Sequence, residues 1–309
     1  MRALRTVFAG TPQFAVPALQ TLIDSDHPPL AVLCQPDRPA GRGRRLNIGP
    51  VKACALDAGI DVLQPGSLKS EEARAPLVDL QPDLIVTAAY GLLLPRAVLD
   101  LPEFGCWNLH ASLLPRWRGA SPINQAILAG DSDTGMTLMQ MDPGLDTGPI
   151  LMTASTRISP EETAGDLHDR LSLLAAELLG DALGGLASGR LPEPQAQDGE
   201  EATHAPLIQR DDARLDWTRP ADELARQVRA YNPWPVAFGE VNGVELRVFE
   251  ASAIGPIEGA PGTLLRGRGN GENLVVACGN GALALREVQA SGRKRVTARD
   301  WLNGHPDWA

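Results

Sequence analysis

Two polar residues of the chain have types and spacing that suit catalysis, and a third could join them. Asn108 and His110 lie two residues apart in the run Cys106-Trp107-Asn108-Leu109-His110, and in a strand such residues point to the same face. Asp146 lies in a later loop rich in glycine and proline. An amide can stabilise a developing oxyanion, while an imidazole and a carboxylate can move protons. The spacing therefore predicts a catalytic pair at Asn108 and His110, and Asp146 could reach the same crevice.

A structural role is the alternative for each of these residues. A lone histidine of this kind is more often a core residue whose hydrogen bonds are satisfied within the protein than a residue of a functional site. Asp146 taken alone suits a turn as well as a catalytic acid, and Asp142, which precedes Pro143, fits a turn. The neighbouring asparagine, the irregular loop after His110 and the downstream carboxylate favour the catalytic interpretation.

The elements that must position these residues follow from the hydrophobic pattern. Up to about residue 187, short apolar runs alternate with helix-like stretches, which is typical of a doubly wound α/β sheet. The predicted strands are 6–9, 30–35, 61–63, 83–89, 106–110, 136–141 and 150–156. The predicted helices are 13–23, 51–58, 68–80, 122–129 and 161–186. In open sheets of this class, ligands bind beyond the carboxyl ends of the strands, which is where His110 and the loop after it are expected.

A change of composition separates a second region from the first. Residues 189–209 are rich in proline and acidic residues, which is a linker composition. One helix-like stretch follows at 221–230. Short strand-like runs interrupted by glycine and proline come next, at 236–241, 244–254, 262–265, 273–277 and 282–289, and they favour a small OB-like β-barrel. We expect a domain at 1–188, a linker at 189–209 and a smaller domain at 210–309.

Composition and charge exclude several classes of protein. The chain has 309 residues, 43% of them hydrophobic, and a net charge of −10, which excludes disorder and a uniformly basic nucleic-acid coat. The first residues lack the continuous apolar stretch of a signal peptide, and the four cysteines form no C-x-x-C pair. We therefore expect reduced structural thiols, no metal site and a cytoplasmic protein.

The first strand–turn–helix of the chain does not match a dinucleotide-binding motif. One glycine, Gly10, stands where a dinucleotide fingerprint has three, which argues against an NAD enzyme.

Two segments are basic within this acidic chain. Residues 37–52 hold five basic residues against one acid, and residues 286–299 hold five against one, a net of +4 in each. A charge run is usually a solvated face. Arginine also suits phosphates, and a Gly- and Arg-rich loop beside a sheet edge is less ordinary. Both segments are therefore candidate contacts for the end of an RNA.

The run Asn108 to Gly119, with Asp146 downstream, resembles the signature of the formyltransferases that use 10-formyltetrahydrofolate. Further matches are Phe8-Ala9-Gly10-Thr11-Pro12, the run Gln35-Pro36-Asp37-Arg38-Pro39-Ala40-Gly41-Arg42-Gly43, Gln140-Met141-Asp142 and Tyr231-Asn232-Pro233-Trp234-Pro235. Together these runs resemble the members of the family that act on methionyl-tRNA.

This resemblance implies a fold, a reaction and a set of residues. The fold is a Rossmann-like doubly wound formyltransferase domain followed by an OB-like β-barrel domain that binds tRNA. The reaction transfers the formyl group of 10-formyltetrahydrofolate to the α-amino group of methionyl initiator tRNA for translation initiation, without a metal.

The resemblance also implies which residues do the work. The implied catalytic residues are Asn108, His110 and Asp146. The implied folate-binding residues are Ser112, Leu113, Leu114, Pro115, Tyr90 and Gly91. The implied tRNA-binding residues are Arg38, Arg42, Arg44, Arg45, Arg293, Lys294 and Arg295. A monomer is the default oligomeric state.

Two other functions are compatible with parts of this pattern. A formyltransferase acting on a small amine, either an amino sugar nucleotide or glycinamide ribonucleotide, would share the catalytic residues, and the two basic segments favour tRNA over it. A non-catalytic RNA-binding protein on the same scaffold would not require three catalytic residue types in matching places.

We expect Arg42→Ala and Arg44→Ala each to raise the KM for tRNA and to flatten its salt dependence, because each variant loses a phosphate contact. Steady-state kinetics over a series of salt concentrations measures both quantities. A change in unfolding free energy with an unchanged KM would make this segment a plain solvated surface.

Overall fold

The structure, a computed structural model, describes residues 3–40 and 45–308, with the backbone alone at 38–40 and 45–47. The chain divides into two compact units. The first unit contains the residues up to 122 together with 133–157 and 168–205, and the second contains 123–132, 158–167 and the residues from 206 onwards. The segment expected to be a linker, 189–209, therefore belongs to the first unit as far as residue 205.

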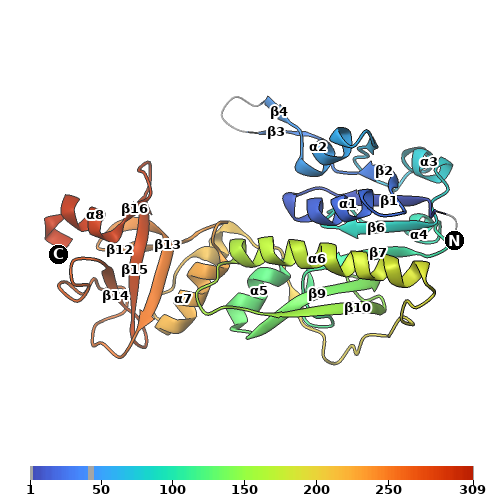
Figure 1. The fold of residues 1–309 in the computed structure, drawn as a ribbon. Helices are drawn as coiled ribbons and strands as arrows, with labels where there is room; N and C mark the ends of the chain where they lie inside the picture. Colours follow the sequence, from blue (N-terminus) through green and yellow to red (C-terminus); the bar gives the residue numbers. More distant parts are fainter. Residues whose placement is uncertain (1–2, 41–44, 309) are drawn as a thin grey trace. The chain divides into compact units, whose positions relative to one another are not determined.

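A seven-stranded mixed sheet forms the centre of the first unit (Figure 1). Its strand order is β10-β9-β7-β6-β1-β2-β5. The strands are β1 (Thr6–Gly10), β2 (Pro29–Leu33), β5 (Asp61–Leu63), β6 (Leu84–Ala88), β7 (Cys106–His110), β9 (Asp133–Gln140) and β10 (Ile150–Arg157). The strands from β7 to β5 are parallel, whereas β9 runs antiparallel to β7 and β10 antiparallel to β9. The completely buried strands β1 and β6 are almost entirely apolar, as strands covered on both faces must be.

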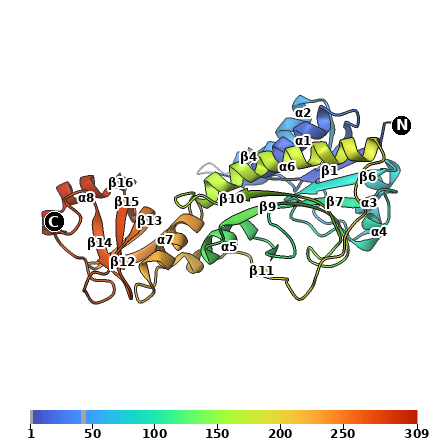
Figure 2. The same ribbon diagram turned by 60° about the horizontal axis from the view of Figure 1, so that its bottom comes forward.

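Helices cover both faces of this sheet. They are η1 (Gln13–Ala15), α1 (Val16–Ile23), α2 (Pro50–Asp57), α3 (Glu71–Asp79), α4 (Arg96–Leu99) and α6 (Ala164–Ala187). Helix α5 (Pro122–Ala129) belongs, from residue 123, to the second unit. Figure 2 shows α1, α2 and α6 on one side of the sheet and α3 and α4 on the other. Val7 and Ile85 pack with Leu77 of α3 and Val98 of α4. In the described part of the chain, no helix is both long and apolar enough to cross a membrane.

Two short strand pairs lie outside the main sheet. Strands β3 (Arg38–Ala40) and β4 (Arg45–Asn47) form an antiparallel hairpin inside the basic segment 37–52, near α2 in Figure 1. Strand β8 (Arg118–Gly119), in the loop after β7, pairs in parallel with β11 (His204–Ala205). Sequence reasoning expected neither pair, because each strand has only two or three residues and no periodicity to reveal it.

The second unit contains a curled antiparallel sheet. Its strand order is β12-β13-β15-β14, with β16 paired to β15. The elements are η2 (Arg210–Ala213), α7 (Ala221–Ala230), β12 (Ala237–Val241), β13 (Val244–Ile254), β14 (Leu274–Ala277), β15 (Ala282–Ala290), β16 (Val296–Thr297), α8 (Ala298–Gly304) and η3 (Pro306–Trp308). Leu224 and Val228 of α7 pack on Leu246, Val248 and Leu285 of the sheet. The predicted strand 262–265 is reduced to one bridge, between Leu264 and Val276. The expected fold class is confirmed.

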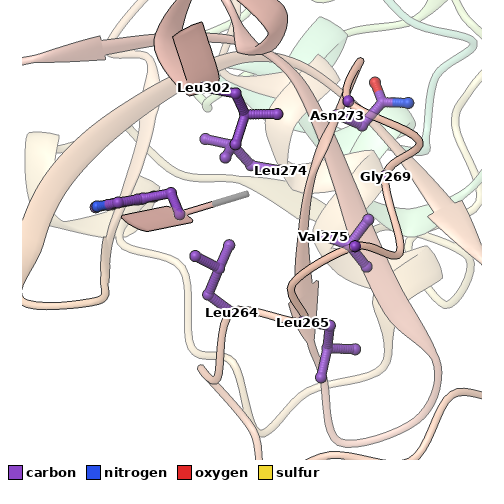
Figure 3. Close-up of a pocket in the computed structure, with 10 residues that line it drawn as sticks. Leu264, Leu265, Gly269, Asn273, Leu274, Val275 and Leu302 are labelled. Carbon is purple, nitrogen blue, oxygen red and sulfur yellow. The ribbon is translucent and has the colours of Figure 1, made fainter. Parts of the chain in front are cut away.

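A small apolar cavity of about 130 Å³ lies in the second unit (Figure 3). Leucine and valine side chains line it, among them Leu264, Leu274 and Val275, and Leu302 of α8 lies next to Leu274. Asn273 is the single polar side chain among those labelled in Figure 3. No titratable side chain lines the cavity, so it provides packing space rather than catalytic chemistry.

The four cysteines are free thiols, and three of them are buried. Burial raises the pKa of Cys106 to about 12 and that of Cys278 to about 11. Because the thiolate is the reactive form of cysteine, these two thiols are structural, as their spacing had indicated.

Candidate active site

Asn108 is oriented by a neighbour on the next strand. The parallel register of β6 and β7 places Thr87 beside Asn108, and the Thr87 hydroxyl donates a hydrogen bond of 2.8 Å to Asn108 Oδ1. The amide oxygen is therefore engaged, and in the described part of the chain Asn108 Nδ2 has no acceptor. Both N–H groups of Nδ2 are available to a substrate, as an oxyanion donor requires.

His110 lies at the end of β7 between two acceptors. Its Nε2 is 2.9 Å from the carbonyl oxygen of Trp117, and because a carbonyl only accepts, Nε2 carries a proton. Its Nδ1 lies 3.7 Å from Asp146 Oδ2. The His110 side chain is 6% exposed and the Asp146 side chain 16%, so water scarcely reaches this pair.

Asp146 reaches His110 by a route that the sequence does not reveal. Because β9 is antiparallel to β7, its last residue, Gln140, lies beside Trp107 at the start of β7. The chain then returns along β7, passing Thr87 with the Met141 sulfur at 3.5 Å from Thr87 Oγ1. The Gly119 N–H donates a 2.9 Å hydrogen bond to Asp146 Oδ2. The structure thus brings together all three predicted catalytic residues on one face of β7.

The predicted folate loop is held tightly by its own polar groups. Ser112 is completely buried, and its hydroxyl donates to the Arg116 carbonyl at 2.6 Å. The hydroxyl of Thr137, on β9, donates to the Ser112 carbonyl and accepts from the Leu114 N–H. Leu114 is buried, whereas Leu113 and Pro115 are partly exposed. Ser112 and Leu114 therefore shape the loop, and Leu113 and Pro115 are its accessible side chains.

Tyr90 and Gly91 lie just beyond the end of β6. The Tyr90 ring packs in the apolar core with Leu94 and Val98, and burial raises the pKa of its hydroxyl to about 12. Its carbonyl accepts hydrogen bonds from Thr11 Oγ1 at 3.2 Å and from Gln35 Nε2 at 3.1 Å. Gly91 has a φ of +76°, and a Cβ there would collide with Gln35 Nε2. The backbone of this turn, rather than the Tyr90 side chain, faces the polar edge of the sheet.

The basic hairpin is closed at its base by an ion pair. Lys52 Nζ lies 2.5 Å from Asp37 Oδ2 and 2.7 Å from Gln64 Oε1, and Gln64 Nε2 donates to Asp37 Oδ1 at 3.0 Å. The hydrogen bonds from Lys52 and Gln64 lower the pKa of the Asp37 carboxyl. Of the predicted tRNA contacts, Arg42 and Arg44 lie outside the described residues, and the side chains of Arg38 and Arg45 are likewise not described.

The C-terminal basic segment is partly neutralised. Arg295 forms an ion pair with Glu287 and lies over the Phe249 ring at 4.4 Å. Arg286 pairs with Glu250 at 3.1 Å. Arg293, Lys294 and Arg299 are exposed, and the structure gives them no ion pair within the described residues. The available positive charge of this segment is therefore carried by those three residues.

The described residues include no group of three or more histidine, cysteine or acidic side chains that could hold a metal ion. Asp142, the other acid of the catalytic loop, accepts hydrogen bonds from the Gly144 N–H and the Thr147 hydroxyl. These bonds form the turn expected of this residue.

Two family descriptions match the chain. Residues 4–183 match "Formyl transferase" and residues 207–306 match "Formyl transferase, C-terminal domain". The chain belongs to the formyl transferase family.

Relatives of this formyl transferase extend over almost its whole length. The methionyl-tRNA formyltransferase of Methylococcus capsulatus is 53% identical over 303 residues, 98% of this chain and 97% of that protein. The protein of the same name from Xanthomonas campestris pv. campestris is 53% identical over 305 residues, 98% of each chain. The crystal structure of WlaRD, a sugar 3N-formyl transferase in the presence of dTDP and 5-N-formyl-THF, has a TM-score of 0.68 and 15% identity, covering 95% of this chain and 100% of that one. This last likeness shows the fold.

Sequence reasoning missed the residues that hold the site of this formyl transferase together. Thr87 had a detectable signal, since it is the single polar residue in the strand Leu84–Ala88. Gln197 donates to the carbonyls of Asp146 and Gly148, and Thr203 accepts from the Trp117 N–H. Both lie in the segment expected to be a linker, where nothing in the composition distinguishes them.

We expect Thr87→Val to lower kcat by about tenfold or more, short of the 10²–10³ that loss of an oxyanion donor itself costs. Valine keeps the shape of the side chain but leaves Asn108 Oδ1 without its donor, so the amide is free to rotate. Single-turnover kinetics of formyl transfer measures the effect, and Thr87→Ser, which keeps the hydroxyl, is the control. A wild-type rate in the valine variant would contradict this role of Thr87.

Proposed function

We propose that the chain transfers the formyl group of 10-formyltetrahydrofolate to the α-amino group of methionyl initiator tRNA, in the cytoplasm, for translation initiation. The observation that carries this proposal is the 53% identity, over nearly the full length, to proteins named methionyl-tRNA formyltransferase. The site supports it independently, because amide donors and an imidazole–carboxylate pair lie on one strand face, as formyl transfer to an amine requires.

The nucleophile needs little activation by the protein. An α-amino group titrates near ~7.7–8.0 in model compounds, so part of it is neutral at physiological pH. The amine nitrogen attacks the formyl carbon, and the carbonyl electron pair moves to the formyl oxygen. Asn108 Nδ2 donates to that oxygen, while Thr87 keeps the amide in the donating orientation. The amide therefore stabilises charge that exists only after attack.

One proton must then move from the attacking nitrogen to the leaving nitrogen. The amine becomes positively charged on attack, and Asp146 accepts its proton, directly or through water. His110, whose Nδ1 faces Asp146 Oδ2, is the donor that protonates N10 as the bond from the formyl carbon to N10 breaks. Asp146 then passes the proton it accepted to His110 Nδ1, which it faces, so both groups regain their starting protonation. The products are the formylated amine and tetrahydrofolate.

The folate contacts are assigned to two loops near the site. We assign the folate to the loop Ser112, Leu113, Leu114 and Pro115, in which Leu113 and Pro115 are the partly exposed side chains, and to the turn at Tyr90 and Gly91. The crystal structure of WlaRD, obtained in the presence of 5-N-formyl-THF, supports a folate donor in this fold. We assign residues 1–188 to the catalytic domain, 189–209 to the segment between domains and 210–309 to the tRNA-binding domain of a monomer.

The tRNA contacts are assigned to the two basic segments. In the first, Arg38 and Arg45 lie on the paired strands β3 and β4, next to the Asp37–Lys52 pair in sequence, and Arg42 and Arg44 stand between them in the sequence. In the second, Arg293 and Lys294 are exposed and without ion pairs within the described residues, whereas Arg295 is neutralised by Glu287. Local positive charge of this kind can bind phosphates on a chain whose net charge is −10.

The deciding experiment offers three acceptors with 10-formyltetrahydrofolate: charged initiator tRNA, an amino sugar nucleotide and glycinamide ribonucleotide. Mass spectrometry identifies which amine gains the formyl group. Formylmethionyl-tRNA supports the proposal, and formylation of either small amine would replace it with the small-molecule alternative. No transfer to any acceptor, together with tRNA binding, would favour a non-catalytic RNA-binding protein.

We expect His110→Ala to lose on the order of 10²–10⁴ in turnover, the range for loss of a general acid or base, with folate affinity close to wild type. Steady-state kinetics and titration with the folate measure the two quantities. His168→Ala is the matched control, because His168 pairs with Asp169 on α6 and lies outside the site. Near-normal turnover in the His110 variant would refute the assigned role.

We expect Lys294→Ala and Arg293→Ala to raise the KM for tRNA and each to reduce its salt slope by about 1, the effect of losing one phosphate contact. Arg295→Ala should change both quantities less, because Glu287 already neutralises Arg295. Kinetics at several salt concentrations compares the three variants. Equal effects in all three would show that the ion pair does not determine which side chains bind tRNA.

A further inference from the structure

We propose that Gln197 and Thr203 are positioning residues that hold in place the two groups facing the ring nitrogens of His110, the Trp117 carbonyl and the Asp146 carboxylate. The inference rests on the proposed function, since it concerns the same catalytic residues. Both side chains belong to residues 195–205, the part of the expected linker that packs along the catalytic loops of the first unit. The segment therefore supports the catalytic loops and does not only connect two domains.

Gln197 uses its whole amide group to join two loops. Its Nε2 donates to the Asp146 carbonyl at 2.9 Å and to the Gly148 carbonyl at 2.7 Å. Its Oε1 accepts from Arg118 Nε at 3.0 Å and from Arg118 Nη2 at 2.7 Å. Four hydrogen bonds from one partly buried side chain leave the amide a single orientation. The loop carrying Asp146 is therefore fastened to the strand that follows the His110 loop.

Thr203 holds the other partner of His110. Its hydroxyl accepts from the Trp117 N–H at 2.8 Å, and its carbonyl accepts from the Arg118 N–H at 2.9 Å. Trp117 is the residue whose carbonyl accepts from His110 Nε2. Two residues further on, the Ala205 carbonyl faces Gly119, where a Cβ would lie 2.5 Å away. Close backbone approach at Gly119 is what allows its N–H to reach Asp146 Oδ2.

The backbone conformations of Trp117 and Asp146 show why these hydrogen bonds are needed. Trp117 has a φ of +63° and Asp146 a φ of +54°, the left-handed region that residues other than glycine adopt only when their surroundings impose it. Thr203 and Gln197 each bind the backbone of one of these two residues. The conformations that aim the Trp117 carbonyl and the Asp146 carboxylate at His110 are therefore maintained from residues 195–205.

A substitution of Gln197 can keep its contact with Arg118 while removing its contacts with the loop that carries Asp146. The guanidinium is buried, with 8% of the residue exposed, and the described residues place no carboxylate within ion-pair distance of it. Gln197→Glu keeps an acceptor for Arg118 and adds a negative charge that suits it. The same change removes both donors to the Asp146 and Gly148 carbonyls. The variant thus preserves the contact with Arg118 and releases the catalytic loop.

The first test compares Gln197→Glu with Gln195→Glu. Gln195 lies two residues away, is exposed, and pairs with Ile150 through its backbone alone. We expect Gln197→Glu to lower kcat by about 10²-fold, the cost of misplacing a catalytic group by about 1 Å, with KM values for folate and tRNA within about twofold of wild type. Gln195→Glu should behave as wild type. Equal kcat in the two variants would overturn the proposal.

The second test asks whether Gln197 acts through Asp146. In an Asp146→Asn background, Gln197→Glu should lower kcat by no more than about twofold, because residues that act as a unit are not additive. An undiminished effect in that background would indicate general damage to the fold and overturn the proposal. If Asp146→Asn alone left kcat unchanged, the catalytic role of Asp146 would fail and this inference with it. The proposed function would fail only if the unaltered protein formylated no methionyl-tRNA, so the two failures are distinguishable.

Substitutions of Thr203 test the proposal without depending on whether the Gln197 variants fold. Thr203→Val removes the hydroxyl with little change of shape, and Thr203→Ser retains it. We expect a lowered kcat in the valine variant and recovery in the serine variant, with KM for folate unchanged. A valine variant that loses only unfolding free energy, with kcat unchanged, would limit Thr203 to a structural role.

Discussion

The site depends on the position of one imidazole between two acceptors. His110 meets the Trp117 carbonyl with Nε2 and faces the Asp146 carboxylate with Nδ1, and these acceptors come from loops that enter from different ends of β7. Because both contacts must hold at once, the loop after β7 and the loop after β9 cannot move independently. The pairing of β8 with β11 and the amide of Gln197 are the means by which the two loops are joined.

Much of the architecture could be predicted from periodicity. Strands Asp61–Leu63, Cys106–His110 and Val244–Ile254 have the expected bounds, because each is apolar or alternating over its whole length. Asn108 and His110 share a face for the same reason. The antiparallel direction of β9 could not be predicted, since hydrophobic pattern carries no sign of strand direction. Gln197 could not be identified either, because its importance lies in contacts 51 and 79 residues away along the chain.

Charge in this protein is best described segment by segment. The sum of −10 hides two basic segments, and the structure divides one of them further. Arg286 and Arg295 are paired with Glu250 and Glu287 on the same sheet, so they add little field beyond their immediate surroundings. In the other segment, the single acid, Asp37, is already paired with Lys52.

The reversed direction of β9 imposes a length on the chain that follows it. Residues 141–149 leave the sheet beside Trp107 and must place a carboxylate at His110, three residues further along β7, a span of about 10 Å at ~3.3 Å per residue. The end of this loop is confined as well, because Gly148 lies directly against the Gln140 carbonyl. About three extended residues are needed to cover that span, and Asp146 follows Gln140 by six, so the segment before Asp146 can also include the turn that Asp142 forms with Gly144. The distance to His110 thus sets a minimum length for this part of the chain.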